Sequence, residues 1–318
     1  MMSVKGLLME TSATDLDREQ KANRIRRKAE EISKNSESVL WQLGQLALAL
    51  RCAAARRSLT LVIKSYWRYY YKNNHAKYPR ETNVELPIDS QIPFEPKALG
   101  AYISYVGLCA AAVNFLRVEF GSDVSADIKN FFISMVSFYP EAAEVFKTAQ
   151  TGFERTGQGG FGIKLLRMID TEKNASPSLH VIVAAYIYFG LEKIFDARGG
   201  LQKVYEPLKK VYFDKTVKIV ESVLLVKQHV VMDVALGLVL LSGGDSSAVP
   251  AKIHEFVEAI FKNNNYGINQ EVIFAARGEI IFIYDKVMAD IARNNSSAAN
   301  EIIKYLRSLE VSPQGVMV

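Results

Sequence analysis

Helical periodicity constrains the fold of this chain more than any other feature of its sequence. Apolar residues recur three and four positions apart along almost its whole length, which is the spacing of a buried helix face. Alternating β-branched runs bounded by turn pairs, the pattern of half-buried strands, are missing. A chain of 318 residues can bury a sizeable core, as one large domain or as two. We therefore expect an all-α fold built as a helical bundle.

Turn-forming and charged segments divide the first half of the chain. Residues 13–36 predict a charged helix, and residues 39–72 continue with an apolar half and then a basic aromatic half. Four prolines within residues 73–97 predict a connection there. Residues 127–148 predict a further helix that breaks near Pro140, because proline removes a helical hydrogen bond.

The second half begins with a glycine-rich loop, residues 150–162, which lacks the spacing of a nucleotide-binding loop. Ser176 and Pro177 then predict a helix start, with serine as the cap and proline in the first turn, and the helix is expected to reach about Phe195. A long helical stretch follows over residues 203–241. Residues 249–309 predict three amphipathic helices separated by two runs of asparagine.

Two of the four histidines lie in short motifs that suit phosphoryl transfer. The first motif is Pro177-Ser178-Leu179-His180, at the start of a predicted helix. Unpaired N–H groups and the dipole at a helix N-terminus favour an anion such as phosphate. The hydroxyl of Ser178 can donate to a phosphoryl oxygen, and His180 can protonate a leaving oxygen.

The second motif contains Ser222, His229 and Asp233. The histidine and the aspartate are four residues apart, so on a helix they share one face. The carboxylate can hold one ring nitrogen and leave the other free to attack phosphorus. Taken singly, each motif histidine is explained more simply as a hydrogen-bonded residue of a packed helix, because short motifs are weak signals.

Together the motifs resemble those of the type 2 phosphatidic acid phosphatase superfamily, which includes lipid phosphatases, soluble acid phosphatases and vanadium haloperoxidases. The family's second motif has the form P-S-[GL]-H and its third the form S-R-x5-H-x3-D. Residues 174–180 and 222–233 are similar to them, with Lys227-Gln228 before the second histidine as in the Pro-Ser-Leu-His branch. Residues 88–94 resemble a segment that often precedes an early membrane helix in these proteins.

The resemblance covers about residues 85–242 and implies a helical bundle of the phosphatase and haloperoxidase type. Residues 1–84 would then add charged and basic-aromatic helices before it, and residues 243–318 amphipathic helices after it. The implied substrate is a phosphomonoester or diphosphate, free or linked to a lipid. No cofactor and no metal ion is expected.

The resemblance also implies a role for each motif residue. His229 would be the nucleophile that forms a phosphohistidine, Asp233 its partner, and His180 the general acid. The residues expected to contact the phosphate are Ser178, Arg155, Lys227 and Ser222.

The chain departs from the family pattern at its cations. The first motif, K-x6-R-P, is incomplete, because Arg155 is followed by threonine and Lys147 is one residue out of step. Val223 replaces the arginine of the third motif, which leaves Arg155 and Lys227 as the available cations. On a continuous helix Lys227 would point about 200° away from His229. A scaffold without catalysis, which binds a membrane or a partner, is therefore the alternative function.

Several segments bear on a membrane location. Residues 98–116 carry no charge and predict either a membrane span or a buried central helix. Residues 201–221 carry many charges and should not insert as a lipid-facing span. Residues 51–80 combine basic side chains with tyrosines and a tryptophan and contain no acid. That composition suits an anionic membrane surface or a solvated helix face, with single-stranded nucleic acid ranked third.

We therefore expect a membrane-associated protein, either integral with few spans or peripheral, with a cytoplasmic protein as the alternative. The first 38 residues are charged and lack the order of a secretory signal. Cys52 and Cys109 have no metal-binding or redox spacing and are expected to be buried thiols, with a single disulfide as the alternative. The sequence leaves the oligomeric state open.

Overall fold

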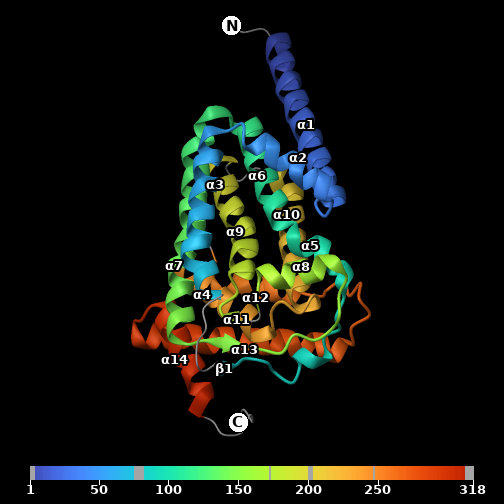
Figure 1. Ribbon diagram of the computed structural model, residues 1–318. Coiled ribbons are helices and arrows are strands. Elements are labelled where there is room, and N and C mark those ends of the chain that lie inside the picture. The colour runs from blue at the N-terminus through green and yellow to red at the C-terminus, as the bar shows by residue number, and fades with distance from the viewer. Residues whose placement is uncertain (1–3, 75–81, 172, 200–202, 246–247, 312–318) are drawn as a thin grey trace.

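The computed structural model describes residues 4–74, 82–171, 173–199, 203–245 and 248–311 (Figure 1). It is predominantly helical, which confirms the all-α prediction. Among the described residues, extended structure is limited to two strands of two residues each, which pair in parallel.

A central helix, α9 (Leu179–Gly199), organises the bundle. Apart from His180, its first two turns are apolar on every side and buried, as expected for a helix in the middle of a core. The helices that pack against it are α6 (Tyr105–Phe120), α7 (Ser125–Thr148), α10 (Glu206–Leu225) and α11 (Val231–Gly244). Most of α11 is equally buried, so the two helices that follow the histidine motifs form the centre of the protein.

Three N-terminal helices cover one side of this core: α1 (Val4–Asn35), α2 (Val39–Ala49) and α3 (Ala53–Ser65). Helix α1 packs against α10, and its N-terminal part extends beyond the bundle in Figure 1. Helix α2 packs against α6, and α3 packs against α7. A β-carbon on Gly107 of α6 would lie 2.4 Å from Cγ of Gln42, so only glycine allows α2 to approach so closely.

The basic aromatic segment forms a short π-helix, η1 (Tyr66–Tyr71), and then α4 (Lys72–Asn74). Neighbouring rings of the segment are in contact at tilted angles, with Trp67 and Tyr71 centred 4.4 Å apart and their planes 55° apart. Two basic residues of segment 51–80, Lys77 and Arg80, lie outside the described residues.

The uncharged segment 98–116 is a broken helix. A 3₁₀ turn, η3 (Pro96–Ala98), leads into α5 (Leu99–Ile103), and α6 begins two residues later. At the break the hydroxyl of Ser104 donates to the carbonyl of Ala101 at 2.7 Å, and the Ser104 N–H donates to the same carbonyl at 3.0 Å. This serine replaces helical bonds with a tighter turn.

The predicted break near Pro140 is wrong. After a 3₁₀ turn, η4 (Gly121–Val124), α7 runs without interruption through the proline. An interior proline costs about 3 kcal/mol or more. Buried side chains on both sides of it, including Phe138 and Phe146, offset this cost by holding α7 against α3, α9 and α11.

The predicted start of the helix after Ser176 is also wrong. Helix α9 begins at Leu179, and its cap is Ser178, whose hydroxyl oxygen accepts from the Val181 N–H at 3.2 Å. The predicted continuous stretch 203–241 is two helices, because α10 ends at Leu225 and α11 begins at Val231. A 3₁₀ turn, η5 (Lys203–Tyr205), precedes α10.

The prediction of three helices over residues 249–309 is confirmed. They are α12 (Pro250–Ala259), α13 (Gln270–Asn294) and α14 (Ala298–Val311). Helix α13 packs on α11 and α14 on α7, at the end of the bundle opposite the start of α1 (Figure 1).

The strand pair positions the loops around the first motif. Strand β1 (Thr82–Asn83) pairs with β2 (Thr151–Gly152), and the Asn174 N–H donates to the Thr151 carbonyl at 2.7 Å. The segment before the motif is thus fixed beside β2. The remaining short helices are η2 (Asp89–Gln91) and α8 (Phe161–Ile169).

One helical run, Pro96–Thr148, is long and apolar enough to cross a membrane by length and composition alone. Its most apolar window is 67% buried inside the protein, and the core helix of a protein in water meets the same criteria. The run is therefore only a weak indication of a membrane. Cys52 and Cys109 are free and buried, as predicted.

Candidate functional site

His229 and Asp233 form the centre of the candidate site. Nδ1 of His229 lies 3.1 Å from Oδ2 of Asp233, and both side chains are buried. The carboxylate accepts on the same oxygen from the Val230 N–H at 3.1 Å. Because this carboxylate only accepts hydrogen bonds, a neutral His229 carries its proton on Nδ1 and leaves Nε2 as the basic nitrogen.

Asp233 also joins the two histidine motifs. Its other carboxylate oxygen accepts from the hydroxyl of Ser176, and its backbone carbonyl accepts from the Ser178 N–H at 3.2 Å. Asp233 lies in the first turn of α11, while Ser178 caps α9. The N-termini of two buried helices therefore meet at this residue, and helix N-termini favour negative charge.

The loop before His229 explains why the helix breaks there. At the end of α10, the Gln228 N–H donates to the Val223 carbonyl at 3.1 Å and the Lys227 N–H donates to the Leu224 carbonyl at 3.3 Å. This is a Schellman ending, whose left-handed position usually holds glycine. Here that position is Lys227, with a φ of 55°. The N–H of His229 also donates to the Val223 carbonyl, at 3.2 Å.

The side chain of Lys227 lines the same cavity as His229, but its ammonium group is bound to backbone carbonyls. Its ammonium group donates to the carbonyls of Asp89 and Ile92 at 2.7 and 2.6 Å. Burial lowers the pKa of this amine, although Asp89 opposes the shift. Lys227 therefore anchors the segment around η2 onto the end of α10.

Arg155 likewise binds backbone carbonyls. Its two terminal nitrogens donate to the carbonyls of Asp170 and Thr171 at 2.6 and 2.7 Å. Of its hydrogen-bonding atoms, only Nε is buried without a partner. Both predicted phosphate-binding cations thus hold loops in place.

The two predicted serines are buried within helix ends. The hydroxyl oxygen of Ser178 accepts from the first turn of α9, and the hydroxyl of Ser222 donates to the Ile219 carbonyl at 2.5 Å. Ser222 and Ser178 are both fully buried. Neither lines the cavity at His229.

That cavity is small and acidic. Its volume of about 10 Å³ leaves room for about one water molecule. Besides His229 and Lys227, the ionisable side chains that line it are Glu85, Asp89 and Glu154. Burial raises the pKa of Asp89 to about 6, against the hydrogen bonds from the N–H groups of Leu86 and Val231.

His180 lines a different cavity, of about 320 Å³. Its Nε2 lies 2.9 Å from the Tyr102 carbonyl oxygen, and its ring stacks on the Tyr102 ring with centroids 4.0 Å apart. Burial lowers the pKa of His180 to about 4, and the charge of His229 adds to the shift, while Asp170 opposes it. The two motif histidines are near enough to feel each other's charge, yet they face different spaces.

Sequence reasoning missed three polar residues of these sites: Ser176, Asp89 and Asp170. The sequence indicates Ser176 only as a helix cap, since its hydrogen bond to Asp233 joins residues 57 positions apart and leaves no local pattern. Asp89 was present in the segment that resembles the family, and its carboxylate accepts from the Val231 N–H at 2.8 Å. Asp170 had no sequence signal.

No protein-family model, curated protein or solved structure matches this chain. Across the described parts of the chain, no group of three or more histidine, cysteine, aspartate or glutamate side chains is placed to hold a metal ion. The residues themselves therefore carry any functional argument.

Proposed function

We propose that this protein transfers a phosphoryl group from a phosphomonoester or diphosphate through a phosphohistidine at His229. The contact between His229 and Asp233 carries the proposal, because it holds one ring nitrogen and leaves the other as a nucleophile. The meeting of two helix N-termini at Asp233 supports it, since their dipoles favour a negative charge on the carboxylate that holds His229.

In the proposed reaction, Nε2 of His229 attacks phosphorus and the bond to the leaving oxygen breaks. The leaving oxygen takes a proton, for which His180 is the proposed donor; because His180 lines a separate cavity, the reaction requires the two spaces to join when substrate enters. A neutral imidazole is a poor acid, so this role requires the bound phosphate to raise the pKa of His180 from about 4. Water then attacks the phosphohistidine, releases phosphate and restores His229. The cavity must open to admit the substrate, because about 10 Å³ does not hold a phosphate group.

A scaffold without catalysis is the second candidate, favoured by one observation. Lys227 and Arg155 both donate to backbone carbonyls, so the protein itself already engages the hydrogen-bonding groups of both cations. Phosphoryl transfer depends on positive charge around the transferred group. In this second proposal the helical bundle serves as a scaffold without catalysis, and the protein acts by binding a membrane or a partner.

The deciding experiment compares wild type with His229→Ala and a matched control, His254→Ala. His254 is a partly exposed histidine on α12 that pairs with Asp285. With a panel of soluble and lipid phosphoesters, we expect His229→Ala to lower phosphate release by about a thousandfold or more and the control to leave it unchanged. If the wild-type protein neither releases phosphate nor accumulates phosphohistidine, the phosphoryl-transfer proposal is refuted and the scaffold proposal is supported.

We further propose that the protein lies against a membrane surface. The basic residues of segment 51–80 and the exposed side chains of Leu61, Ile63 and Trp67 support this placement. A peripheral protein should leave the membrane fraction during a carbonate wash, whereas an integral protein should remain. Recovery only in the soluble fraction before the wash would refute the membrane placement.

A further inference from the structure

A tyrosine-lined cavity beside His180 continues into a second, apolar cavity. The volumes are about 320 and 330 Å³, each within the usual range for small-molecule sites. The two cavities share five of their lining residues: Tyr66, Tyr105, Val106, Tyr139 and Val183. A single ligand can therefore occupy the two together.

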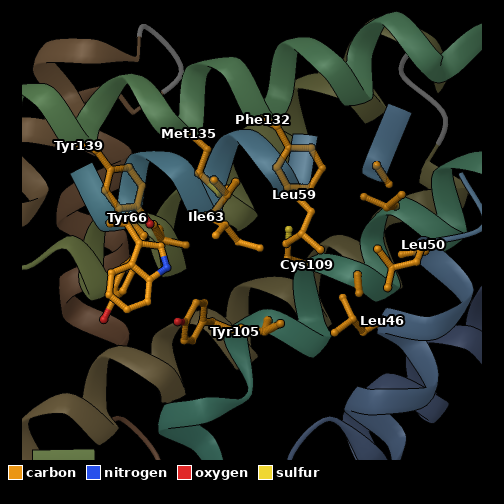
Figure 2. A pocket seen from close by; sticks show the side chains of 18 residues that line it. Leu46, Leu50, Leu59, Ile63, Tyr66, Tyr105, Cys109, Phe132, Met135 and Tyr139 are labelled. Carbon is orange, nitrogen blue, oxygen red and sulfur yellow. The ribbon is translucent and has the colours of Figure 1, made fainter. Parts of the chain in front are cut away.

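The apolar part is lined by residues of α2, α3, η1, α6 and α7, together with Val183 of α9. Figure 2 shows side chains from these elements directed into it, among them Leu46, Leu59, Phe132 and Met135. No charged side chain is among the residues that line this part, all of which the structure describes. Such a space suits an alkyl chain.

The other part contains polar groups among apolar side chains. Its lining includes five tyrosines, and they surround a single acidic residue, Asp170. The hydroxyls of Tyr70 and Tyr102 both donate to the Asp170 carboxylate, the latter at 3.0 Å. No lysine or arginine is among the described residues that line it. The tyrosines of this part are Tyr66, Tyr70, Tyr102, Tyr105 and Tyr139.

The electrostatics of this part favour a positive ligand. The faces of tyrosine rings attract cations, and Asp170 adds a full negative charge. His180 adds no positive charge at neutral pH, because burial lowers its pKa to about 4. Arg155 lies near this part, but its terminal nitrogens donate to the carbonyls of Asp170 and Thr171. An anionic headgroup would meet the Asp170 carboxylate with no lining cation to balance it.

We propose that the joined cavities bind a cationic amphiphile, with its ammonium head among the tyrosines beside Asp170 and its alkyl chain in the apolar part. Of the residues proposed for phosphoryl transfer only His180 lines this site, and the binding proposal does not rest on that reaction, because it is argued from Asp170, the tyrosines and the apolar part. It gives Asp170 and the surrounding tyrosines a role that the histidine motifs do not explain.

Three probes with the same tail test the head preference: dodecyltrimethylammonium, dodecanoate and dodecanol, each below its micelle concentration. Binding is measured by calorimetry and by the fluorescence of Trp67, which lines the apolar part. Trp41→Phe leaves Trp67 as the only tryptophan, since the chain has two. The net charge of +5 would attract the carboxylate in non-specific binding, so a preference for the ammonium head points to this cavity.

We expect the ammonium probe to bind at least about tenfold tighter than dodecanoate, as for a charge-assisted contact. Asp170→Asn should weaken it about tenfold and leave dodecanol within about twofold, which also shows that the variant folds. Met135→Trp should weaken all three by filling the apolar part. If Asp170→Asn does not fold, Tyr105→Leu should reduce the preference for the cation.

Equal binding of the ammonium and carboxylate probes would overturn the proposal. So would ammonium binding that neither Asp170→Asn nor Met135→Trp weakens, because the probe would then be bound elsewhere.

Discussion

The ionisation of His180 tests the cavity and the proposed acid role together. The folded protein favours the neutral ring, with a pKa near 4 against 6.5 for an ordinary histidine. The unfolded chain therefore binds more protons between these values, so this contribution to stability is complete above pH 6.5 and is lost as pH falls towards 4. At about pH 5 the loss amounts to at most about 2 kcal/mol.

His180 is only partly buried by surface area, because its ring faces the tyrosine-lined cavity. The full shift therefore requires that cavity to stay dry. Water in the cavity would hydrate the charged ring and move the midpoint back towards that of an exposed histidine.

The measurement is a histidine NMR titration with the ring Cε1–Hε1 signals of the four histidines. The His180 signal is identified by its absence in His180→Phe, which keeps a ring between Tyr102 and Tyr105. Urea unfolding gives the free energy of unfolding of wild type and of His180→Phe at about pH 5 and at about pH 7.5. The difference between the two proteins should change by about 2 kcal/mol from one pH to the other. A His180 midpoint above about 6 would refute a dry cavity around a neutral ring.

Three further changes test the packing around the motifs. Burial raises the pKa of Asp89 to about 6, so ionisation of its carboxyl lowers the free energy of unfolding as pH rises from about 4 to about 6. In urea unfolding, Asp89→Asn should remove up to about 3 kcal/mol of that pH dependence. An unchanged pH dependence would contradict the burial of Asp89. Lys227→Ala and Lys227→Gly both lose the bonds of the ammonium group, but only glycine relaxes the φ of 55°, so the glycine variant should be about 1 kcal/mol more stable; equal stabilities would exclude strain. Gly107→Ala should cost about 1–3 kcal/mol by forcing α2 away from α6 at Gln42, and a neutral result would show that this contact is looser than described.

The sequence predicted the helices well where local pattern decides them. The three C-terminal helices and the charged N-terminal helix follow from periodicity and turn residues, which act over a few positions. The helix through Pro140 was not predictable in this way, because packing of α7 against distant helices offsets the local cost. The cap at Ser178 rather than Ser176 was equally ambiguous, since two serines flank one proline.

The candidate site was predicted only in part, for a related reason. The contact between His229 and Asp233 follows from the motif, but the expected shared helix face is wrong, because His229 lies two residues before α11 and only Asp233 belongs to its first turn. The break before it does not, since Lys227 occupies a left-handed position that sequence patterns assign to glycine. The partners of Lys227 and Arg155 are backbone carbonyls, and their identity depends on how distant loops fold.

The two proposed sites meet at His180, which leads to one more prediction. Asp170 is a charge that raises the pKa of His180, and a bound ammonium head would cancel its effect. A cationic amphiphile in the tyrosine-lined cavity should then lower the fraction of His180 that is protonated, and so slow phosphate release from a soluble phosphoester. Inhibition should be strong with dodecyltrimethylammonium, weak with dodecanol, and relieved by Asp170→Asn. A probe that binds in calorimetry but leaves turnover unchanged would show that His180 does not supply the proton, and the proposed acid would have to be sought on the side of the bundle that faces His229.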